Sequence, residues 1–332
     1  MNAQGRRILV TGAQGFLGRH VCAALMGAGA AAVVGVGRSP RRAGHYTHPL
    51  SADDPDRPAP LPAHLAGVDR HPAYDYVRMD ARDQPALVDL LRRTGATSVV
   101  HCAAALRDSP WPELVAANLD ATHAVLAAGA EAGMRRVVLV SSGSVYGGSE
   151  GRLPIREDGP LVPVDLYGAT KRAAEDVARI LATRAGIELV CARVFNIIGP
   201  GLQDRHLPAV LAARLTDPGD GPITLALGAL GATRDFVDVR DAADAVALLV
   251  GTADPPPVVN IASGIETAMR DLVEGFVRVS GRPAEVRAGA ARPGDTARVV
   301  ADIAVLRGLG HRPRHGLEDS IRDMLAYARA AR

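Results

Sequence analysis

Tyr167 and Lys171 are the two residues of this sequence best suited to moving a proton. They are four positions apart, so a helix would place both side chains on one face, one turn apart. A phenol loses its proton near pH ~10, and a neighbouring ammonium group favours the phenolate. Ser142 ends an apolar run and could hydrogen-bond the same substrate oxygen. An exposed tyrosine and a solvated lysine would show the same spacing, but the three residues together predict acid–base chemistry on a hydroxyl or carbonyl group.

A second motif lies near the start of the chain, where a predicted buried strand ends at Thr11 and a helix begins near Phe16. The turn between them contains Gly12, Gly15 and Gly18. The first amide groups of a helix are unpaired and carry a partial positive charge, which suits a pyrophosphate, and glycines let the backbone approach the phosphates closely. An ordinary strand-to-helix turn could also contain three glycines. The second predicted strand, Ala31–Val36, supplies the strand, helix, strand context of a dinucleotide site.

The residues after that second strand bear on which dinucleotide would bind. An acidic residue there accepts hydrogen bonds from the ribose hydroxyls of NAD, whereas an arginine can pair with the extra phosphate of NADP. The sequence has no acid at this point and instead has Arg38, Ser39, Pro40, Arg41 and Arg42. The pattern favours NADP(H), with NAD(H) as the alternative, although a solvated basic loop would look the same.

Apolar and helix-like segments alternate through the first half of the chain. Further strands are predicted at Tyr76–Asp80, Ser98–Ala105 and Arg136–Ser142, and helices near Gln84–Arg93 and Trp111–Ala132. Strands that are apolar at nearly every position are typical of parallel sheets covered on both faces. We therefore expect an α/β fold with a doubly wound parallel sheet, a Rossmann fold, and a smaller, α-rich substrate domain. Residues 1–195 and 232–262 are assigned to the dinucleotide-binding domain, and residues 196–231 and 263–332 to the substrate domain.

Residues 39–74 show no regular period and are rich in Pro, His, Asp and Arg. We therefore expect a long surface excursion. Loops of this length are often functional, so the segment is a candidate flap over the cofactor. Its histidines, His45, His48, His64 and His71, lack the spacing of a metal site.

Composition excludes several other classes of protein. With 332 residues, 48% hydrophobic and 22% charged, the chain has ordinary globular usage, but aromatic residues make up 3%, which argues against stacking platforms for single-stranded nucleic acid. A net charge of +2 spread along the chain predicts no basic face for nucleic acid or membranes.

The cysteines and the start of the chain bear on location. Cys22, Cys102 and Cys191 lack metal-ligand spacing and fit a reducing compartment. The first strand starts early and no apolar run has membrane-spanning length, so we expect a cytoplasmic protein that does not bind membranes.

Together these motifs resemble the extended short-chain dehydrogenase/reductase family, which comprises nucleotide-sugar epimerases, dehydratases and reductases. The resemblance is carried by Thr11-Gly-x-x-Gly-x-x-Gly18, Asp80, His101-Cys-Ala-Ala104, Asn118, Ser141-Ser142 with Val145-Tyr-Gly147, and Tyr167-x-x-x-Lys171. It continues through Arg193–Gly201, Thr233–Asp241 and Ala291–Asp295 and so covers nearly the whole chain.

The resemblance implies a role for individual residues. The catalytic residues would be Ser142, Tyr167 and Lys171. The cofactor, with its adenine at Asp80, would contact Gly12, Gly15, Phe16, Leu17, Gly18, Arg38, Ser39, Asp80, Ala81, Ala103, Ala104, Tyr167 and Lys171. A nucleotide-diphosphate sugar would contact Ser144, Asn196, Arg234 and Arg292, and the forked guanidinium groups of the two arginines suit a diphosphate. Members of the family are often dimers, so a homodimer is expected.

The residues after Ser142 help to sort the reactions of the family. Dehydratases carry an Asp-Glu pair there, where this chain has Gly143 and Ser144, so dehydration and the related decarboxylation are disfavoured. The Arg38 region, and the similarity of Asn196–Gly201 and Arg234–Asp241 to reductases such as the GDP-4-keto-6-deoxymannose reductase group, favour reduction of an NDP-4-keto-6-deoxyhexose at C4. Other segments, Ser141–Gly147 and Arg292–Asp295, are equally similar to epimerases. An NDP-hexose 4-epimerase with tightly bound NAD is therefore the alternative, and a cofactor-binding sensor without catalysis is a third, which the presence of all three catalytic residues disfavours.

Overall fold

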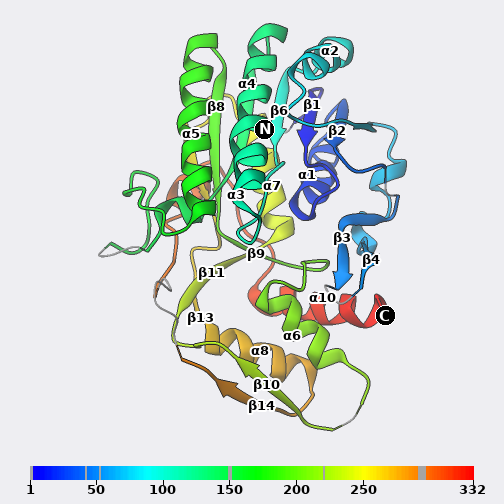
Figure 1. The fold of residues 1–332 in the computed structure, drawn as a ribbon, viewed down its shortest axis with the longest axis vertical. Coiled ribbons are helices and arrows are strands. Elements are labelled where there is room, and N and C mark those ends of the chain that lie inside the picture. Colours follow the sequence, from blue (N-terminus) through cyan, green and yellow to red (C-terminus); the bar gives the residue numbers. More distant parts are fainter. Residues whose placement is uncertain (1–2, 42, 52–53, 149–151, 220, 291–296) are drawn as a thin grey trace.

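The computed structural model describes residues 3–41, 43–51, 54–148, 152–219, 221–290 and 297–332. Its centre is a seven-stranded sheet in which all neighbouring strands are parallel, in the order β12-β8-β7-β6-β1-β2-β5 (Figure 1). The strands are β1 (Arg7–Thr11), β2 (Ala32–Gly37), β5 (Tyr74–Arg78), β6 (Ser98–His101), β7 (Arg136–Ser142), β8 (Glu188–Val194) and β12 (Val258–Ile261). The predicted doubly wound α/β fold is confirmed.

Helices cover both faces of this sheet. One face is covered by α1 (Phe16–Gly27) and α7 (Val239–Gly251), and the other by α2 (Gln84–Thr94), α4 (Ala121–Ala132) and α5 (Leu166–Ala185). Successive side chains of a strand point to opposite faces, so Ile8 and Val10 belong to the first core and Leu9 to the second. Burial on both sides explains why these strands are apolar at nearly every position.

Residues 39–74 differ from the expected surface excursion. They contain an antiparallel hairpin and two short 3-10 turns, and the elements are β3 (His45–Ser51), β4 (Asp54–Pro60), η1 (Ala63–Leu65) and η2 (Val68–Arg70). Tyr46 and Leu65 are 0% and 1% exposed and belong to the core that contains α1. The expectation was wrong for these residues because each buried side chain stands alone among prolines and histidines, so no period marks it in the sequence.

The hairpin connects the glycine loop to the end of the chain. The Thr47 amide donates to the Gln14 carbonyl (3.2 Å), and the His48 ring lies 2.8 Å from the Gly201 carbonyl oxygen. On the second strand of the hairpin, Arg57 donates to the Ala331 carbonyl at 2.6 Å. The segment therefore packs between the glycine loop and the C-terminal helix.

A second, smaller part of the molecule occupies the lower half of Figure 1. It contains α6 (Leu207–Thr216), α8 (Met269–Ser280), α10 (Leu317–Ala330) and the parallel pair β10 (Ile223–Leu227) and β14 (Ala284–Ala288). Leu211, Phe276 and Leu325 belong to its own hydrophobic core. A separate sheet has three strands, in the order β13 (Glu266–Ala268), β11 (Thr233–Asp238) and β9 (Asn196–Ile198). Its strand β9 comes directly after β8 in the chain. The exact domain boundaries given above stay a prediction. Among the described residues, no helix combines the length and apolarity needed to cross a membrane.

Candidate active site

The glycine loop after β1 has the geometry of a backbone cradle. Gly12 has φ +67°, and a Cβ atom there would lie 2.8 Å from the Ala103 amide nitrogen. A Cβ atom on Gly18 would overlap the Gly12 carbonyl group. The Gly15 amide closes the turn by donating to the Gly12 carbonyl at 2.9 Å, and α1 begins at the next residue. Only glycine fits these close approaches, and the first amides of α1 are thereby placed at the carboxyl edge of the sheet.

The loop after β6 is held against this cradle by Thr11. Its hydroxyl is 2.7 Å from the His101 Nδ1 atom and accepts a hydrogen bond from the Ala103 amide at 3.2 Å. These bonds turn the chain, so that β6 ends at His101 rather than at Ala105 as predicted. The backbone of Ala103 therefore lies beside the glycine loop.

A cavity of about 230 Å³ opens at the carboxyl ends of β1, β2 and β6. Its lining includes eight of the predicted cofactor residues: Gly12, Gly15, Arg38, Ser39, Asp80, Ala81, Ala103 and Ala104. The other predicted cofactor residues, Phe16, Leu17, Gly18, Tyr167 and Lys171, do not line it. Thr47, Arg82 and Glu113 do line it and were not predicted. No local pattern marks them, because each comes from a different segment that only the fold brings to this edge.

Asp80 is held at this cavity as a carboxylate. Arg82 donates to both of its oxygens, with Nη2 to Oδ2 at 2.7 Å, and this pairing lowers the pKa of the Asp80 carboxyl below its ordinary value. An ionised Asp80 is an acceptor for donors such as an adenine amino group.

At the other end of the site, helix α5 brings Tyr167 to Ser142. Asp165 caps the helix by accepting a hydrogen bond from the Gly168 amide at 2.7 Å. A Cβ atom on Gly168 would lie 2.6 Å from the Ser144 carbonyl oxygen, so this glycine allows the helix to approach the end of β7 closely. The Ser142 side chain acts on the Tyr167 phenol by lowering its pKa, so the two hydroxyl groups lie near each other. The predicted pair of hydroxyl groups therefore meets in the fold.

Lys171 lies one turn further along α5, as the sequence predicts. Lys171 is 4% exposed, and its ammonium group donates to the Val140 carbonyl at 2.6 Å. Burial lowers the pKa of Lys171 to about 8. Burial also raises the pKa of Tyr167, and the Ser142 side chain and the charge of Arg107 oppose that rise. The Lys171 ammonium group is directed to β7 in this structure, and its effect on the phenol pKa stays a prediction.

A buried polar network lies beneath these residues. Glu175 is 0% exposed and accepts hydrogen bonds from the Ser141 hydroxyl at 2.5 Å and from Arg193 at 2.7 Å. Arg193 also donates to the Tyr146 hydroxyl at 2.8 Å. Because a buried charge requires partners, this network fixes α5 against β7 and β8. Glu175 was not predicted from the sequence, although its position one turn after Lys171 was a signal that could have found it.

Asn118 ties the loop after β6 to α5. It is buried in a π-helical turn, η3 (Ala116–Asp120), that separates α3 (Trp111–Val115) from α4. Its side chain accepts from the Ala105 amide and donates to the Thr170 hydroxyl, both at 3.0 Å. The helix predicted as continuous over Trp111–Ala132 is thus interrupted, as is frequent at functional sites.

The predicted substrate residues lie on separate elements. The Ser144 hydroxyl is 3.3 Å from Arg107, which also forms an ion pair with Asp165 at 3.0 Å. Asn196 and Arg234 lie on the neighbouring parallel strands β9 and β11. The predictions for Arg42 and Arg292 fall outside the described residues.

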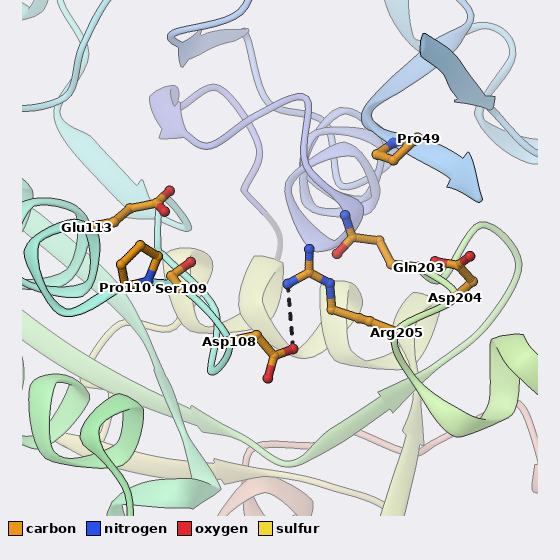
Figure 2. A pocket seen from close by; sticks show the side chains of 8 residues that line it. All are labelled: Pro49, Asp108, Ser109, Pro110, Glu113, Gln203, Asp204 and Arg205. Carbon is orange, nitrogen blue, oxygen red and sulfur yellow. Dashed lines mark ion pairs between the residues drawn. The ribbon is translucent and has the colours of Figure 1, made fainter. Parts of the chain in front are cut away.

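A larger cavity, of about 340 Å³, adjoins the first at Glu113, which lines both. Figure 2 shows Glu113, Pro110 and Ser109 on one side and Pro49, Gln203 and Asp204 on the other. Arg205 and Asp108 form an ion pair at 3.8 Å between the two sides. Within the described ranges, no group of three or more His, Cys, Asp and Glu side chains is arranged to hold a metal ion.

The chain is similar to enzymes that act on nucleotide sugars. Residues 8–262 match the NAD dependent epimerase/dehydratase family. The dTDP-6-deoxy-L-talose 4-dehydrogenase (NAD(P)(+)) of Kitasatospora kifunensis is 32% identical over 96% of this chain and 94% of that protein. The UDP-glucose 4-epimerase of Azospirillum brasilense is 30% identical over 99% of this chain and 93% of that protein. The structure of MoeE5 in complex with UDP-glucose and NAD is 30% identical, with a TM-score of 0.78 over 98% of this chain and 99% of that one.

Proposed function

The chain belongs to the NAD-dependent epimerase/dehydratase family, and from this premise we propose that it reduces an NDP-4-keto-6-deoxyhexose at C4 with NAD(P)H. The observation that carries the proposal is the hydroxyl pair of Ser142 and Tyr167 at the end of β7, followed by Gly143 and Ser144. Loss of water from a sugar needs a further acid and base, whereas reduction of a ketone needs one proton donor. The nearby carboxylate of Asp165 is engaged by the helix cap and by Arg107.

One relative supports oxidation–reduction chemistry at C4. Oxidation of a C4 hydroxyl group and reduction of a C4 ketone are one reaction read in two directions, so the similarity to a dTDP-6-deoxy-L-talose 4-dehydrogenase supports chemistry at this carbon. In this chain, the Tyr167 hydroxyl would donate the proton to the ketone oxygen while the Ser142 hydroxyl orients that oxygen. A nicotinamide held at this site would supply the hydride.

The residues at the carboxyl edge of the sheet fit a dinucleotide. Gly12, Gly15 and Gly18 allow the close backbone approaches that place the first amides of α1 at this edge, where they suit a pyrophosphate, and Asp80 would accept from the adenine. By the family resemblance, Lys171 would contact the nicotinamide end of the cofactor; in this structure its ammonium group donates to the Val140 carbonyl. For the cofactor we propose NADP(H), with NAD(H) as the alternative, because Arg38 and Ser39 line the cavity at the end of β2.

Placement of the sugar nucleotide follows the predicted residues. Ser144, Asn196, Arg234 and Arg292 would contact it, the arginines at its diphosphate and nucleoside. A homodimer is also proposed, through α3 and α5, because Trp111, Leu166 and Ile180 on these helices are large hydrophobic side chains exposed to solvent. Sedimentation of the purified protein measures this.

A second candidate is an NDP-hexose 4-epimerase with tightly bound NAD. It uses the same Ser142 and Tyr167 pair, and the 30% identity to a UDP-glucose 4-epimerase over 99% of this chain favours it. An epimerase regenerates its cofactor in every cycle, so it has no need to release it.

The state of the cofactor distinguishes the two candidates. Nucleotide released from the purified protein by denaturation is identified, and the stripped protein is titrated with NADPH and NADH. The reductase predicts a site that is largely empty after purification and binds NADPH. Stoichiometric NAD that survives purification would contradict the reductase and support the epimerase.

A further inference from the structure

We propose that Glu113 is a second selector between NAD(H) and NADP(H), and that it opposes Arg38. The inference rests on the proposed function in one respect, because it takes the 230 Å³ cavity as the dinucleotide site. The sequence shows no acid after β2 and so predicts NADP(H). The fold supplies an acid at the same place from a different element.

Glu113 and Arg38 face each other at the rim of this cavity. Arg38 directly follows β2, and Glu113 lies in the first turn of α3, and both line the cavity together with Gly12, Gly15 and Asp80. The Arg38 Nη2 and Glu113 Oε1 atoms are 3.9 Å apart, and the two side chains are 65% and 45% exposed. Both charged groups are therefore close enough to interact and open to a ligand.

The backbone on each side of this pair is held in place. The Arg38 carbonyl accepts a hydrogen bond from Arg78 on β5 at 2.9 Å. On the other side, Asn118 binds the Ala105 amide in the loop that leads to α3. The backbone that carries Arg38 and Glu113 is thus held in place at the ends of β2 and β6.

The chemistry of the adenosine ribose makes the two residues opposed selectors. The end of β2 is where a dinucleotide site meets the ribose 2′ position. A carboxylate can accept a hydrogen bond from the 2′-hydroxyl group of NAD and repels the 2′-phosphate of NADP, whereas the Arg38 guanidinium attracts that phosphate. The phosphate must compete with Glu113 for Arg38. Arg82, the other arginine in the lining, is engaged by Asp80.

The test compares Glu113→Gln with the unchanged protein by titration with NADPH and NADH, following nicotinamide fluorescence at low ionic strength. Loss of one opposing charge should tighten NADPH binding and weaken NADH binding, so that the ratio of the two dissociation constants moves toward NADPH by about tenfold, which is the effect of one close charge contact. Arg38→Gln should move the ratio in the opposite direction. Thermal melting checks that both variants are folded.

Glu131→Gln is the matched control. Glu131 lies at the end of α4, is 52% exposed and pairs with Arg92 at 3.4 Å, so it undergoes the same chemical change away from the cavity. The ratio of the NADPH and NADH dissociation constants should be the same in Glu131→Gln as in the unchanged protein. Equal effects of Glu113→Gln on both cofactors, or none, would overturn this inference while leaving the proposed function intact. An unchanged protein that binds neither cofactor would overturn both.

Discussion

The two ends of the proposed cofactor site are built from different kinds of contact. At the catalytic end, Lys171 and Glu175 are 4% and 0% exposed, and both have buried hydrogen-bond partners. At the ribose end, Arg38 and Glu113 are exposed side chains in one loose ion pair. Buried networks are costly to disturb, whereas exposed pairs change stability little. We therefore expect substitutions in the buried network at the catalytic end to destabilise the fold. Substitutions of Arg38 or Glu113 should change the preference for NAD(H) or NADP(H) at little cost in stability.

The largest effect is expected at Tyr167. Tyr167→Phe removes the proposed proton donor but keeps the ring, so turnover should fall by about a hundredfold to ten-thousandfold. The affinity for NADPH should change little, because Tyr167 does not line the cavity that holds most of the predicted cofactor residues. Steady-state kinetics and a cofactor titration measure the two quantities. Retention of full activity would remove Tyr167 from the mechanism, and retention of a biological effect without turnover would favour a sensor.

The next effect concerns the buried network. Glu175→Gln leaves the Arg193 guanidinium buried without its charge partner, and should lower the free energy of unfolding by about 3–5 kcal/mol. Asp176→Asn is the matched control on the same helix, because Asp176 pairs with Arg179 at 2.8 Å with both side chains about half exposed. It should cost less than about 1 kcal/mol. Urea unfolding measures both, and equal losses would show that the catalytic end is not more rigidly held than the surface.

The smallest of these effects is the contribution of Lys171 to the pH dependence of the free energy of unfolding. Burial lowers the pKa of Lys171 from its ordinary 10.5 to about 8, so between these values the folded protein has released a proton that the unfolded chain retains. The stability contributed by this group should therefore rise as the pH increases from about 8 to 10.5, and the burial penalty is fully present below pH 8. Lys171→Met should lack this rise. Unfolding by urea at pH 8 and pH 10 compares the two proteins, and parallel pH dependences would contradict the burial of a charged lysine.

Much of the catalytic end could be predicted from the sequence because its signals are local. Tyr167 and Lys171 share one helix, and Ser142 ends an apolar strand, so spacing and hydrophobic pattern are enough to place them. The glycine loop is readable for the same reason in part: Gly18 is needed by its contact with Gly12 within one strand–turn–helix unit, whereas Gly12 is needed by its approach to Ala103 in the loop after β6.

The remainder depends on tertiary contacts that no local pattern carries. Glu113 meets Arg38 only because β2 and the loop before α3 end at the same edge of the sheet. Tyr46 and Leu65 are single buried side chains in an irregular segment. The Lys171 ammonium group points to the Val140 carbonyl, and spacing along a helix does not determine that.

The central claim is tested most directly by the stoichiometry of the cofactor. Purified protein is mixed with an NDP-4-keto-6-deoxyhexose and NADPH, and the oxidised cofactor and the reduced sugar are both counted, with Tyr167→Phe as the inactive control. Our account predicts one NADPH oxidised for each sugar reduced at C4. Interconversion of NDP-hexose C4 epimers on retained NAD, with no net consumption of NADPH, would contradict it.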